Sequence, residues 1–144
     1  MPLTYEELCI RKYPCWTVYL NANQSYLGSC YAWLNREGGM QRFSDVSVEE
    51  LFELHGSVLP AYEKAIDSLW KPSHMNYAWL GNHIYEHAGH GHLHLIPRYA
   101  SPILFAGREF KDERWGQNYA PRPKPEPEDD ILLLIRDALK YTIT

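Results

Sequence analysis

The sequence predicts one α+β domain with an antiparallel sheet of about five strands, a long helix after the first hairpin and a second helix at the C-terminus. Three patterns predict it: two β-forming segments in residues 16–34, an apolar repeat at helical spacing in residues 47–70, and strong alternation in residues 90–98. A chain of 144 residues has the length of a single domain. We therefore expect residues 1–144 to fold around one core.

The first hairpin is expected in residues 16–34. Residues 16–20 and 29–34 are rich in β-branched and aromatic side chains, and the polar loop between them ends in Gly28. Further along, residues 75–81 are predicted to form a buried strand and residues 82–89 a polar loop. Residues 90–98 then form the next predicted strand.

The long helix is expected in residues 47–70. Ser47 followed by Glu50 is a capping-box pair that precedes an apolar pattern. Pro60 lies inside this pattern and should kink or split the helix. His55 is interpreted as a histidine at the edge of the core rather than as a ligand. The residues that recur at three- and four-residue steps, and so predict one face, are Val48, Leu51, Phe52, His55, Leu59, Tyr62, Ile66 and Leu69.

The C-terminal part is predicted to be a connector and a helix. Alternate prolines in residues 121–127 favour an extended, stiff conformation. Asp129 and Asp130 then begin a helix that runs to about Tyr141, because acidic side chains in a first turn suit the helix dipole. Its predicted apolar stripe consists of Ile131, Leu132, Ile135, Ala138 and Leu139.

Charge and hydropathy argue against two classes of partner. The chain has 14 Lys and Arg against 18 Asp and Glu, a net charge of −4, whereas a dedicated binder of DNA or RNA needs a basic face. The longest aliphatic run, residues 131–135, is far shorter than the ~20 residues of a membrane-spanning helix. Charged residues interrupt the N-terminal stretch, which argues against a signal peptide. We expect neither a nucleic-acid nor a membrane partner.

The three cysteines are expected to be reduced structural thiols of a cytoplasmic protein. Cys9, Cys15 and Cys30 cannot all pair within one chain, and their spacing matches no common zinc or redox motif. The alternative is a metal or redox pair formed by Cys9 and Cys15.

Three histidines form the most informative pattern. Because side chains on a strand alternate between faces, His90, His92 and His94 should project from one face, and Leu93 and Leu95 from the other. A core has no reason to supply hydrogen bonds for three imidazoles in a row. Two chemical interpretations remain open on spacing alone. The imidazoles could bind a metal such as zinc, with His83 or His87 as a further ligand, or one imidazole could be a nucleophile toward phosphorus.

The segment His90-Gly91-His92-Leu93-His94-Leu95-Ile96 resembles the motif of the histidine triad family, in which histidines alternate with apolar residues, and residues 97–99 are also common after that motif. The resemblance extends over roughly residues 16–99. It implies a histidine-triad-like fold and attack on an α-phosphorus through a nucleotidyl-histidine intermediate, which water then hydrolyses without a required metal or other cofactor. It also implies that two such domains often form a homodimer with a continuous sheet.

Carried over position by position, the resemblance implies a role for six residues. His92 would be the nucleophile, and His90 and His94 would orient it, bind phosphate oxygens and help to protonate the leaving group. Asn21 matches a position near the ribose of the nucleotide. Asn82 and the loop to Gly89 correspond to a segment that often contacts phosphates.

The chain also departs from the family pattern. Gly91 replaces the usual apolar residue between the first two histidines, and Ser29 stands where some members have another histidine. The loop before the triad carries extra residues, among them His83, Glu86 and His87. These departures affect the expected activity and the choice of leaving group.

Other candidate contacts are interpreted as structural or surface features. Residues 115–119 resemble a segment near the substrate in some members of the family, but they are interpreted as a glycine turn beside aromatic packing. Trp16, Tyr26 and Trp33 are interpreted as packing residues of the hairpin rather than base-stacking rings. Most members of the later basic set are expected to be solvated, although any one could touch a phosphate. That set is Arg98, Arg108, Lys111, Arg114 and Arg122.

The predicted function is hydrolysis of nucleoside phosphoanhydrides or phosphoramidates, such as dinucleoside polyphosphates or adenosine phosphoramidates. A nucleotidyltransferase is the nearby variant, because another acceptor could replace water. Two alternatives come from other classes. One is a zinc-dependent hydrolase or zinc-binding protein that uses the same histidines, and the other is a catalytically weak nucleotide-binding module, suggested by Gly91 and Ser29.

Overall fold

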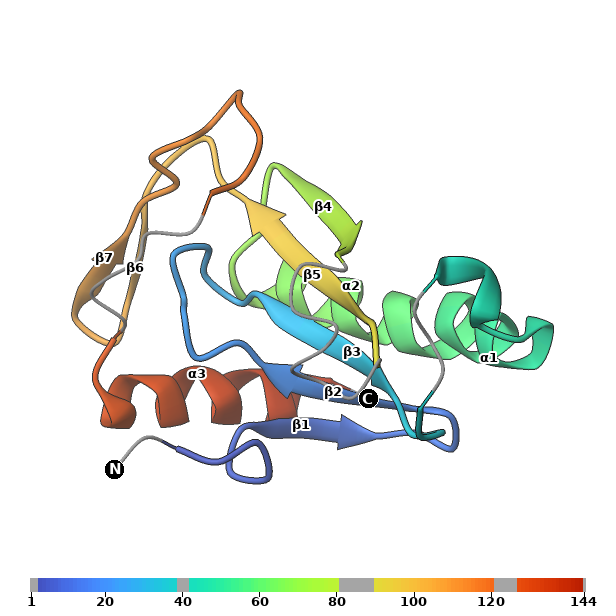
Figure 1. Ribbon diagram of the computed structural model, residues 1–144. Helices are drawn as coiled ribbons and strands as arrows, with labels where there is room; N and C mark the ends of the chain where they lie inside the picture. The colour runs from blue at the N-terminus through green and yellow to red at the C-terminus, as the bar shows by residue number, and fades with distance from the viewer. Residues whose placement is uncertain (1–2, 39–41, 81–89, 121–126, 144) are drawn as a thin grey trace.

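The computed structural model describes residues 3–38, 42–80, 90–120 and 127–143, and it confirms the predicted α+β class. A five-stranded antiparallel sheet has the strand order β1-β2-β3-β5-β4 (Figure 1). Its strands are β1 (Cys9–Lys12), β2 (Trp16–Leu20), β3 (Cys30–Leu34), β4 (His74–Trp79) and β5 (His92–Arg98). A separate hairpin consists of β6 (Ile103–Phe105) and β7 (Arg108–Phe110). Neither β1 nor this hairpin was predicted.

The β2–β3 hairpin is confirmed, with a register from Trp16 opposite Leu34 to Leu20 opposite Cys30. The side chain of Gln24 is almost completely buried and makes hydrogen bonds to the backbone of the loop. The Gln24 amide nitrogen donates to the carbonyl oxygens of Asn21 and Ser29, and its amide oxygen accepts from the backbone N–H of Gly28 at 2.7 Å. The loop is therefore fixed at the point where β3 begins.

The long helix is interrupted by a π-helical turn. It consists of α1 (Val48–Glu53), the π turn η2 (Leu54–Val58) and α2 (Leu59–Leu69), after a short 3-10 turn η1 (Phe43–Asp45). The predicted capping box is present, since Ser47 and Glu50 exchange backbone-to-side-chain hydrogen bonds. Pro60 lies in the first turn of α2, where the missing N–H costs least. The helix is therefore divided just before Pro60, as the sequence suggested.

The predicted apolar face of this helix is wrong in its first half. A π turn uses one more residue than an α-helical turn, so the face before it is out of phase with the face after it. Val48 and Phe52 are 74% and 78% exposed. His55 is also exposed rather than at the core edge. The buried residues of the three segments include Leu54, Val58, Tyr62, Ala65 and Ile66.

Helices α2 (Leu59–Leu69) and α3 (Asp129–Thr142) lie on one face of the sheet, and we call the opposite face of the described sheet the open face. Helix α3 packs against α2 and β1, and its buried residues, Leu132, Ile135 and Leu139, belong to the predicted stripe. Figure 1 shows α2 and α3 behind the sheet. The core between these layers includes the sheet residues Val18, Leu20, Ala32, Leu93 and Leu95. In the described part of the chain, no helix has the length and apolar character needed to cross a membrane.

Strand β4 corrects another expectation. Residues 75–81 were predicted to form a buried strand, but β4 lies at the edge of the sheet and its residues are exposed or half-buried. Its inner neighbour is β5, which places Tyr77 opposite Leu95 and Ala78 opposite His94. The buried strand in this part of the sheet is thus β5, which lies between β3 and β4 and carries His92 and His94.

Candidate functional site

The three histidines lie together on the open face of the sheet, as the alternation predicts. His92 and His94 are on β5, with ring centroids 4.7 Å apart, and His90 precedes the strand. The side chains between them, Leu93 and Leu95, are buried in the core on the opposite face. The period of two residues therefore separates a row of imidazoles from a row of core leucines.

Two aromatic side chains of β3 hold these imidazoles. Trp33 is opposite His92 in the sheet, and its ring stacks on His90 at 4.6 Å and on His92 at 4.8 Å. Tyr31 is opposite His94 and packs edge-on against both His92 and His94, at 5.0 Å in each case. These contacts restrict the rotation of the imidazoles, so the register of β3 on β5 sets the geometry of the site.

Burial keeps His94 neutral. Desolvation lowers the pKa of His94 from 6.5 to about 4, because a charged imidazolium is disfavoured away from water. At pH 7 this ring therefore carries one N–H donor and one nitrogen acceptor. It can donate a hydrogen bond to an oxygen of a bound phosphate without itself bearing a charge.

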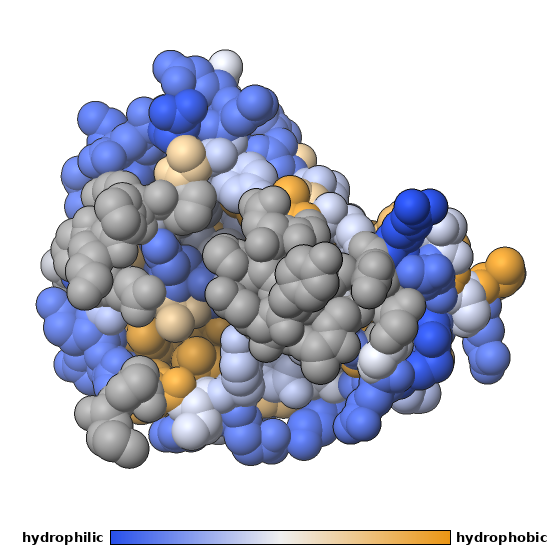
Figure 2. Space-filling view, in the orientation of Figure 1, coloured by the Kyte–Doolittle hydropathy of each residue, from blue (hydrophilic) through white to orange (hydrophobic). Residues whose placement is uncertain are grey.

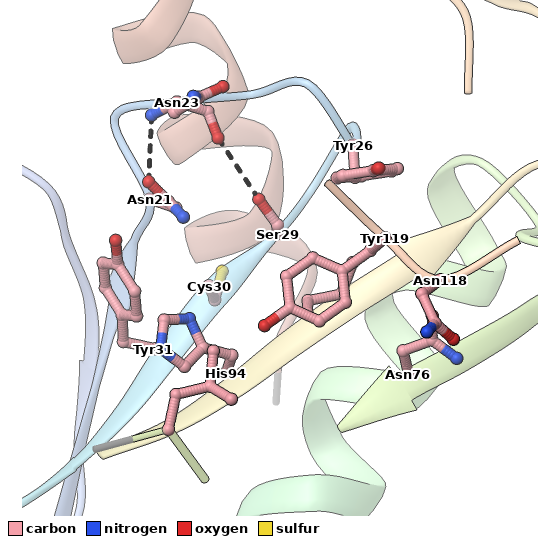
Figure 3. A pocket seen from close by; sticks show the side chains of 12 residues that line it. Asn21, Asn23, Tyr26, Ser29, Cys30, Tyr31, Asn76, His94, Asn118 and Tyr119 are labelled. Carbon is pink, nitrogen blue, oxygen red and sulfur yellow. Dashed lines mark hydrogen bonds between the residues drawn. The ribbon is translucent and has the colours of Figure 1, made fainter. Parts of the chain in front are cut away.

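A pocket of about 740 Å³ opens beside His94 (Figure 3). Its described lining residues carry no Lys, Arg, Asp or Glu side chain. Asn21 and Asn23 come from the β2–β3 loop, and the Asn21 side-chain oxygen accepts a hydrogen bond from the backbone N–H of Asn23. The lining residues are Asn21, Asn23, Tyr26, Ser29, Cys30, Tyr31, Asn76, Leu80, His94, Ile96, Asn118 and Tyr119. An uncharged wall with amide and tyrosine side chains suits a neutral planar group with polar edges.

A second cavity of about 550 Å³ lies at the other end of the triad. It is lined by Tyr19, Trp33 and His90, among others. His92 contacts Tyr31, which lines the first pocket, and Trp33, which lines the second. A ligand that extends from one cavity to the other would pass His92.

The structure brings together some of the predicted site residues and leaves others outside its description. His94, Asn21 and Ser29 line the first pocket, His92 contacts His94, and His90 lines the second cavity. The predicted phosphate contacts Asn82 and Gly89 lie outside the described residues. So do the departures His83, Glu86 and His87, together with Arg122 and most of the proline-rich connector.

The basic residues of the described chain do not line the first pocket. Arg98 is buried and ion-paired with Asp112, so the expectation of a solvated side chain is wrong for this residue. Arg108 lies near Glu128, at 3.4 Å. Lys111 and Arg114 line a smaller neighbouring cavity of about 300 Å³.

For several pocket residues the favoured interpretation of the sequence was packing. Gly116 has a φ of +83°, which confirms the predicted glycine turn, but Asn118 and Tyr119 just beyond it line the pocket, as the alternative of a segment near the substrate suggested. Tyr26 was interpreted as packing, and it both packs and lines the pocket. No local pattern marks Asn118 and Tyr119, because they follow a segment without helical or strand periodicity.

The cysteines are unpaired, and Cys30 is not a nucleophile. Cys30 lines the pocket, but burial raises the pKa of its thiol, and its Sγ donates to the carbonyl oxygen of Gly28. Among the residues that the structure describes, no three His, Cys, Asp or Glu side chains form a group suited to a metal ion. The zinc interpretation included His83 or His87 as a further ligand, and both residues lie outside the described part of the chain.

No protein-family model and no curated protein matches the amino-acid sequence. Solved structures do match. A histidine triad protein from Bradyrhizobium japonicum has a TM-score of 0.67 and 18% identity, over 96% of this chain and 93% of that one. A diadenosine triphosphate hydrolase from Plasmodium falciparum has a TM-score of 0.61 and 12% identity, over 94% and 76% of the two chains. A zinc-bound histidine triad family protein from Mycobacterium smegmatis has a TM-score of 0.58 and 16% identity, over 93% and 84%.

These similarities confirm the fold that the histidine motif implied. The chain has the fold of histidine triad proteins over almost its whole length.

Proposed function

We propose that this chain is a histidine triad enzyme that hydrolyses nucleoside phosphoanhydrides or phosphoramidates through a nucleotidyl-histidine intermediate, with His92 as the nucleophile. One observation carries the proposal. His92 lies between two cavities on the open sheet face, with His90 on one side and His94 on the other. A nucleoside in the first pocket and a leaving group in the second would place the phosphorus beside His92.

The chemistry follows from these positions. A neutral nitrogen of His92 attacks the α-phosphorus, an N–P bond forms, and the P–O or P–N bond to the leaving group breaks. His94 donates its N–H to a phosphate oxygen, and His90, which lines the second cavity, gives the departing group a proton. Water then attacks the phosphorus and returns a proton to His90, the N–P bond to His92 breaks, and the nucleoside monophosphate leaves. One difficult displacement becomes two easier ones.

The first pocket supports recognition of the nucleoside. Asn21 is proposed to bind the ribose, and the amide groups of Asn76 and Asn118 provide donors and acceptors for base edges. Tyr119 provides a flat ring in the same pocket. The charged phosphates belong beside the histidines, where Asn82 and the segment to Gly89 remain predicted contacts.

We also propose that the chain forms a homodimer through β4 and α1. In the described part of the chain, β4 lies at the edge of the sheet, and such an edge presents unpaired backbone groups. Figure 2 shows mostly hydrophilic residues at the end of the molecule where α1 lies, with apolar atoms at its tip, and Val48 and Phe52 of α1 are strongly exposed. Both features suit burial against a second copy.

The unpaired cysteines fit the cytoplasm, where thiols stay reduced.

Zinc chemistry remains the second candidate, because the imidazoles are clustered and a structural neighbour from Mycobacterium smegmatis is zinc-bound. A metal would occupy the ring nitrogens that nucleophilic attack requires to be free. A chelator should therefore leave histidine-based hydrolysis intact and abolish zinc-dependent hydrolysis. A nucleotide-binding module without catalytic activity would bind AMP but would release no product from either substrate.

The test is release of AMP from an adenosine phosphoramidate and from a diadenosine polyphosphate, in excess EDTA. The wild type is compared with His92→Asn, since His92 is buried among aromatic rings and a polar side chain preserves more of that packing than alanine. His55→Asn serves as the matched control, because His55 is exposed on the π turn. We expect turnover that survives EDTA, is unchanged in the control and falls by at least 10³-fold in His92→Asn.

Each other outcome has a definite meaning. Wild-type rates in His92→Asn would show that His92 is not the nucleophile. Turnover lost to EDTA and restored by zinc would favour the metal site. AMP binding without turnover of either substrate would favour the binding module.

A further inference from the structure

Arg98 ends β5, and its guanidinium is almost completely buried, with 2% of the residue exposed. Its Nε and Nη2 donate to the two carboxylate oxygens of Asp112, at 2.7 and 3.1 Å. Nη1 donates to the side-chain oxygen of Asn76 and to the carbonyl oxygen of Gln117, and Nη2 also donates to the carbonyl oxygen of Arg114. A guanidinium has five N–H donors, so all of them are used and none is left for a substrate phosphate.

The partners of Arg98 form one wall of the nucleoside pocket. Asn76 lines the pocket directly. The Gln117 carbonyl belongs to the peptide bond with Asn118, which lines it as well. The guanidinium carbon lies 5.0 Å from the centroid of the Tyr26 ring, which is another part of the lining. One side chain therefore contacts three segments of this wall.

The segment 111–120 needs such a support, because it forms turns rather than helix or strand. Its local backbone bonds include that from the N–H of Gln117 to the carbonyl oxygen of Arg114, at 2.8 Å. Its far end is tied to Tyr26, whose hydroxyl accepts from the N–H of Ala120 at 2.7 Å and whose ring meets Tyr119 edge-on. Side-chain contacts, not a sheet ladder, place Tyr119 in the pocket.

Asp112 joins this segment to the end of β5. Besides the two bonds from Arg98, its carboxylate accepts hydrogen bonds from the backbone N–H groups of Tyr99 and Arg114. Burial works to raise the pKa of Asp112, but the hydrogen bonds outweigh it and hold the pKa below its usual value. The pair stays ionised, and breaking a buried pair of this kind is costly because one charge is left uncompensated.

We infer that Arg98 is a positioning residue that fixes the shape of the nucleoside pocket by holding residues 112–119 against Tyr26 and Asn76, and that Asn118 and Tyr119 are specificity-determining residues presented by this segment. The identity of the ligand as a nucleoside rests on the proposed function. The role of Arg98 in holding residues 112–119 in place does not depend on that function. Since Arg98 does not face the reacting atoms, its loss should weaken binding of the nucleoside far more than it slows the chemical step.

The test compares Arg98→Lys with Arg108→Lys. Lysine keeps the charge beside Asp112 but is a single ammonium, which cannot reach five acceptors in the planar arrangement of a guanidinium. Arg108 is the matched control, because its nearest acid, Glu128, is exposed and lies outside the pocket. With an adenosine phosphoramidate we expect KM to rise at least tenfold in Arg98→Lys, kcat to change less than threefold, and neither to change in Arg108→Lys.

Two further measurements separate positioning from a general loss of stability. Amide hydrogen exchange in Arg98→Lys should rise in residues 113–120 and stay unchanged in α2 and β2. A double-mutant cycle of Arg98→Lys with Tyr119→Leu should be non-additive in KM, because the first change acts through the second residue.

The outcomes also separate this inference from the proposed function. Equal loss of kcat and unchanged KM, additive KM effects, or unaltered exchange in residues 113–120 would each overturn the role of Arg98. If the wild type neither turns over nor binds an adenosine nucleotide, the proposed function fails. The exchange experiment on the unliganded protein then still decides whether Arg98 holds the segment.

Discussion

Removing the titration of His94 should make the protein less sensitive to mild acid. His94 is half-buried between the pocket and the rings of Tyr31 and His92, and desolvation lowers its pKa from 6.5 to about 4. In the unfolded chain the same imidazole gains a proton as the pH falls below about 6.5. The unfolded state therefore binds more protons than the folded state between these two pKa values. The stabilising contribution is complete above pH 6.5 and is lost progressively as the pH falls toward 4.

The size of this loss follows from the two pKa values of His94. From pH 7.5 to pH 5.0, linkage between a pKa of 6.5 unfolded and about 4 folded gives a loss of about 2 kcal/mol. Because the side chain is only partly buried, solvent screening reduces this to roughly 1–2 kcal/mol. Glu50, whose pKa is lowered to about 2 chiefly by its hydrogen bond from Arg36, contributes little in this window, since it titrates at lower pH.

The assay is urea unfolding of the wild type and of His94→Gln at pH 7.5 and 5.0. Glutamine has polar atoms and no charge in this range, so the difference between the two proteins isolates the titration of His94. We expect the free energy of unfolding to fall by roughly 1–2 kcal/mol more in the wild type than in the variant. An equal fall in both proteins would refute a depressed pKa at His94, and with it the assignment of a neutral donor at the phosphate.

Two other predictions concern the hairpin loop and the proposed dimer. Gly28 has a φ of +87°, and an added Cβ would lie 2.6 Å from the Ile66 side chain, so Gly28→Ala should cost about 1–2 kcal/mol in backbone strain and about 1–3 kcal/mol in overpacking. Gly107→Ala, at φ +74° with open space around it, should show the strain alone, and equal urea midpoints for the two variants would contradict the clash. Phe52→Ser, which changes a side chain that is 78% exposed on α1, should shift light-scattering mass from dimer to monomer without lowering the stability of the monomer. An unchanged mass would remove α1 from the proposed interface.

The elements that the sequence predicted are those with a sustained period. Alternation over β5 and the β-forming segments of β2 and β3 were long enough to indicate strands. In the predicted stripe of α3, Leu132, Ile135 and Leu139 are buried, and Ile131 and Ala138 are partly buried against the core. Strand β1 has only four residues and a register shift between Cys9 and Arg11, and β6 and β7 have three residues each. Segments of that length contain too few repeats to reveal a period. The prediction of the buried helical face was wrong before the π turn, because it assumed a constant spacing of apolar residues and the π turn shifts that spacing by one residue.

In the candidate site, too, some residues are positioned by a strand and could be predicted, and others are positioned by tertiary contacts and could not. The row of imidazoles follows from the period of a strand, and Trp33 and Tyr31 follow once β3 is placed beside β5 in a definite register. The other wall of the pocket does not follow from any local rule. Asn118 and Tyr119 lie where they do because Arg98 donates hydrogen bonds to Asp112, to the carbonyl oxygen of Arg114 and to that of Gln117, which are 14, 16 and 19 residues away along the chain.

That difference bears on how substrate preference arises in this fold. The proposed reacting groups are positioned by paired strands, whose geometry is fixed by repeated backbone hydrogen bonds and resists change at single positions. The wall proposed to bind the nucleoside is built on a turn segment that depends on a buried ion pair, so a substitution in residues 113–119 can reshape the pocket while the imidazoles keep their places. We therefore expect changes in base preference to come from this segment, and changes in rate to come from β3 and β5. Exchanging residues 117–119 for other polar triplets, with kcat and KM measured on adenosine and guanosine phosphoramidates, tests the separation. A change in kcat alone would show that the two parts of the site are not independent.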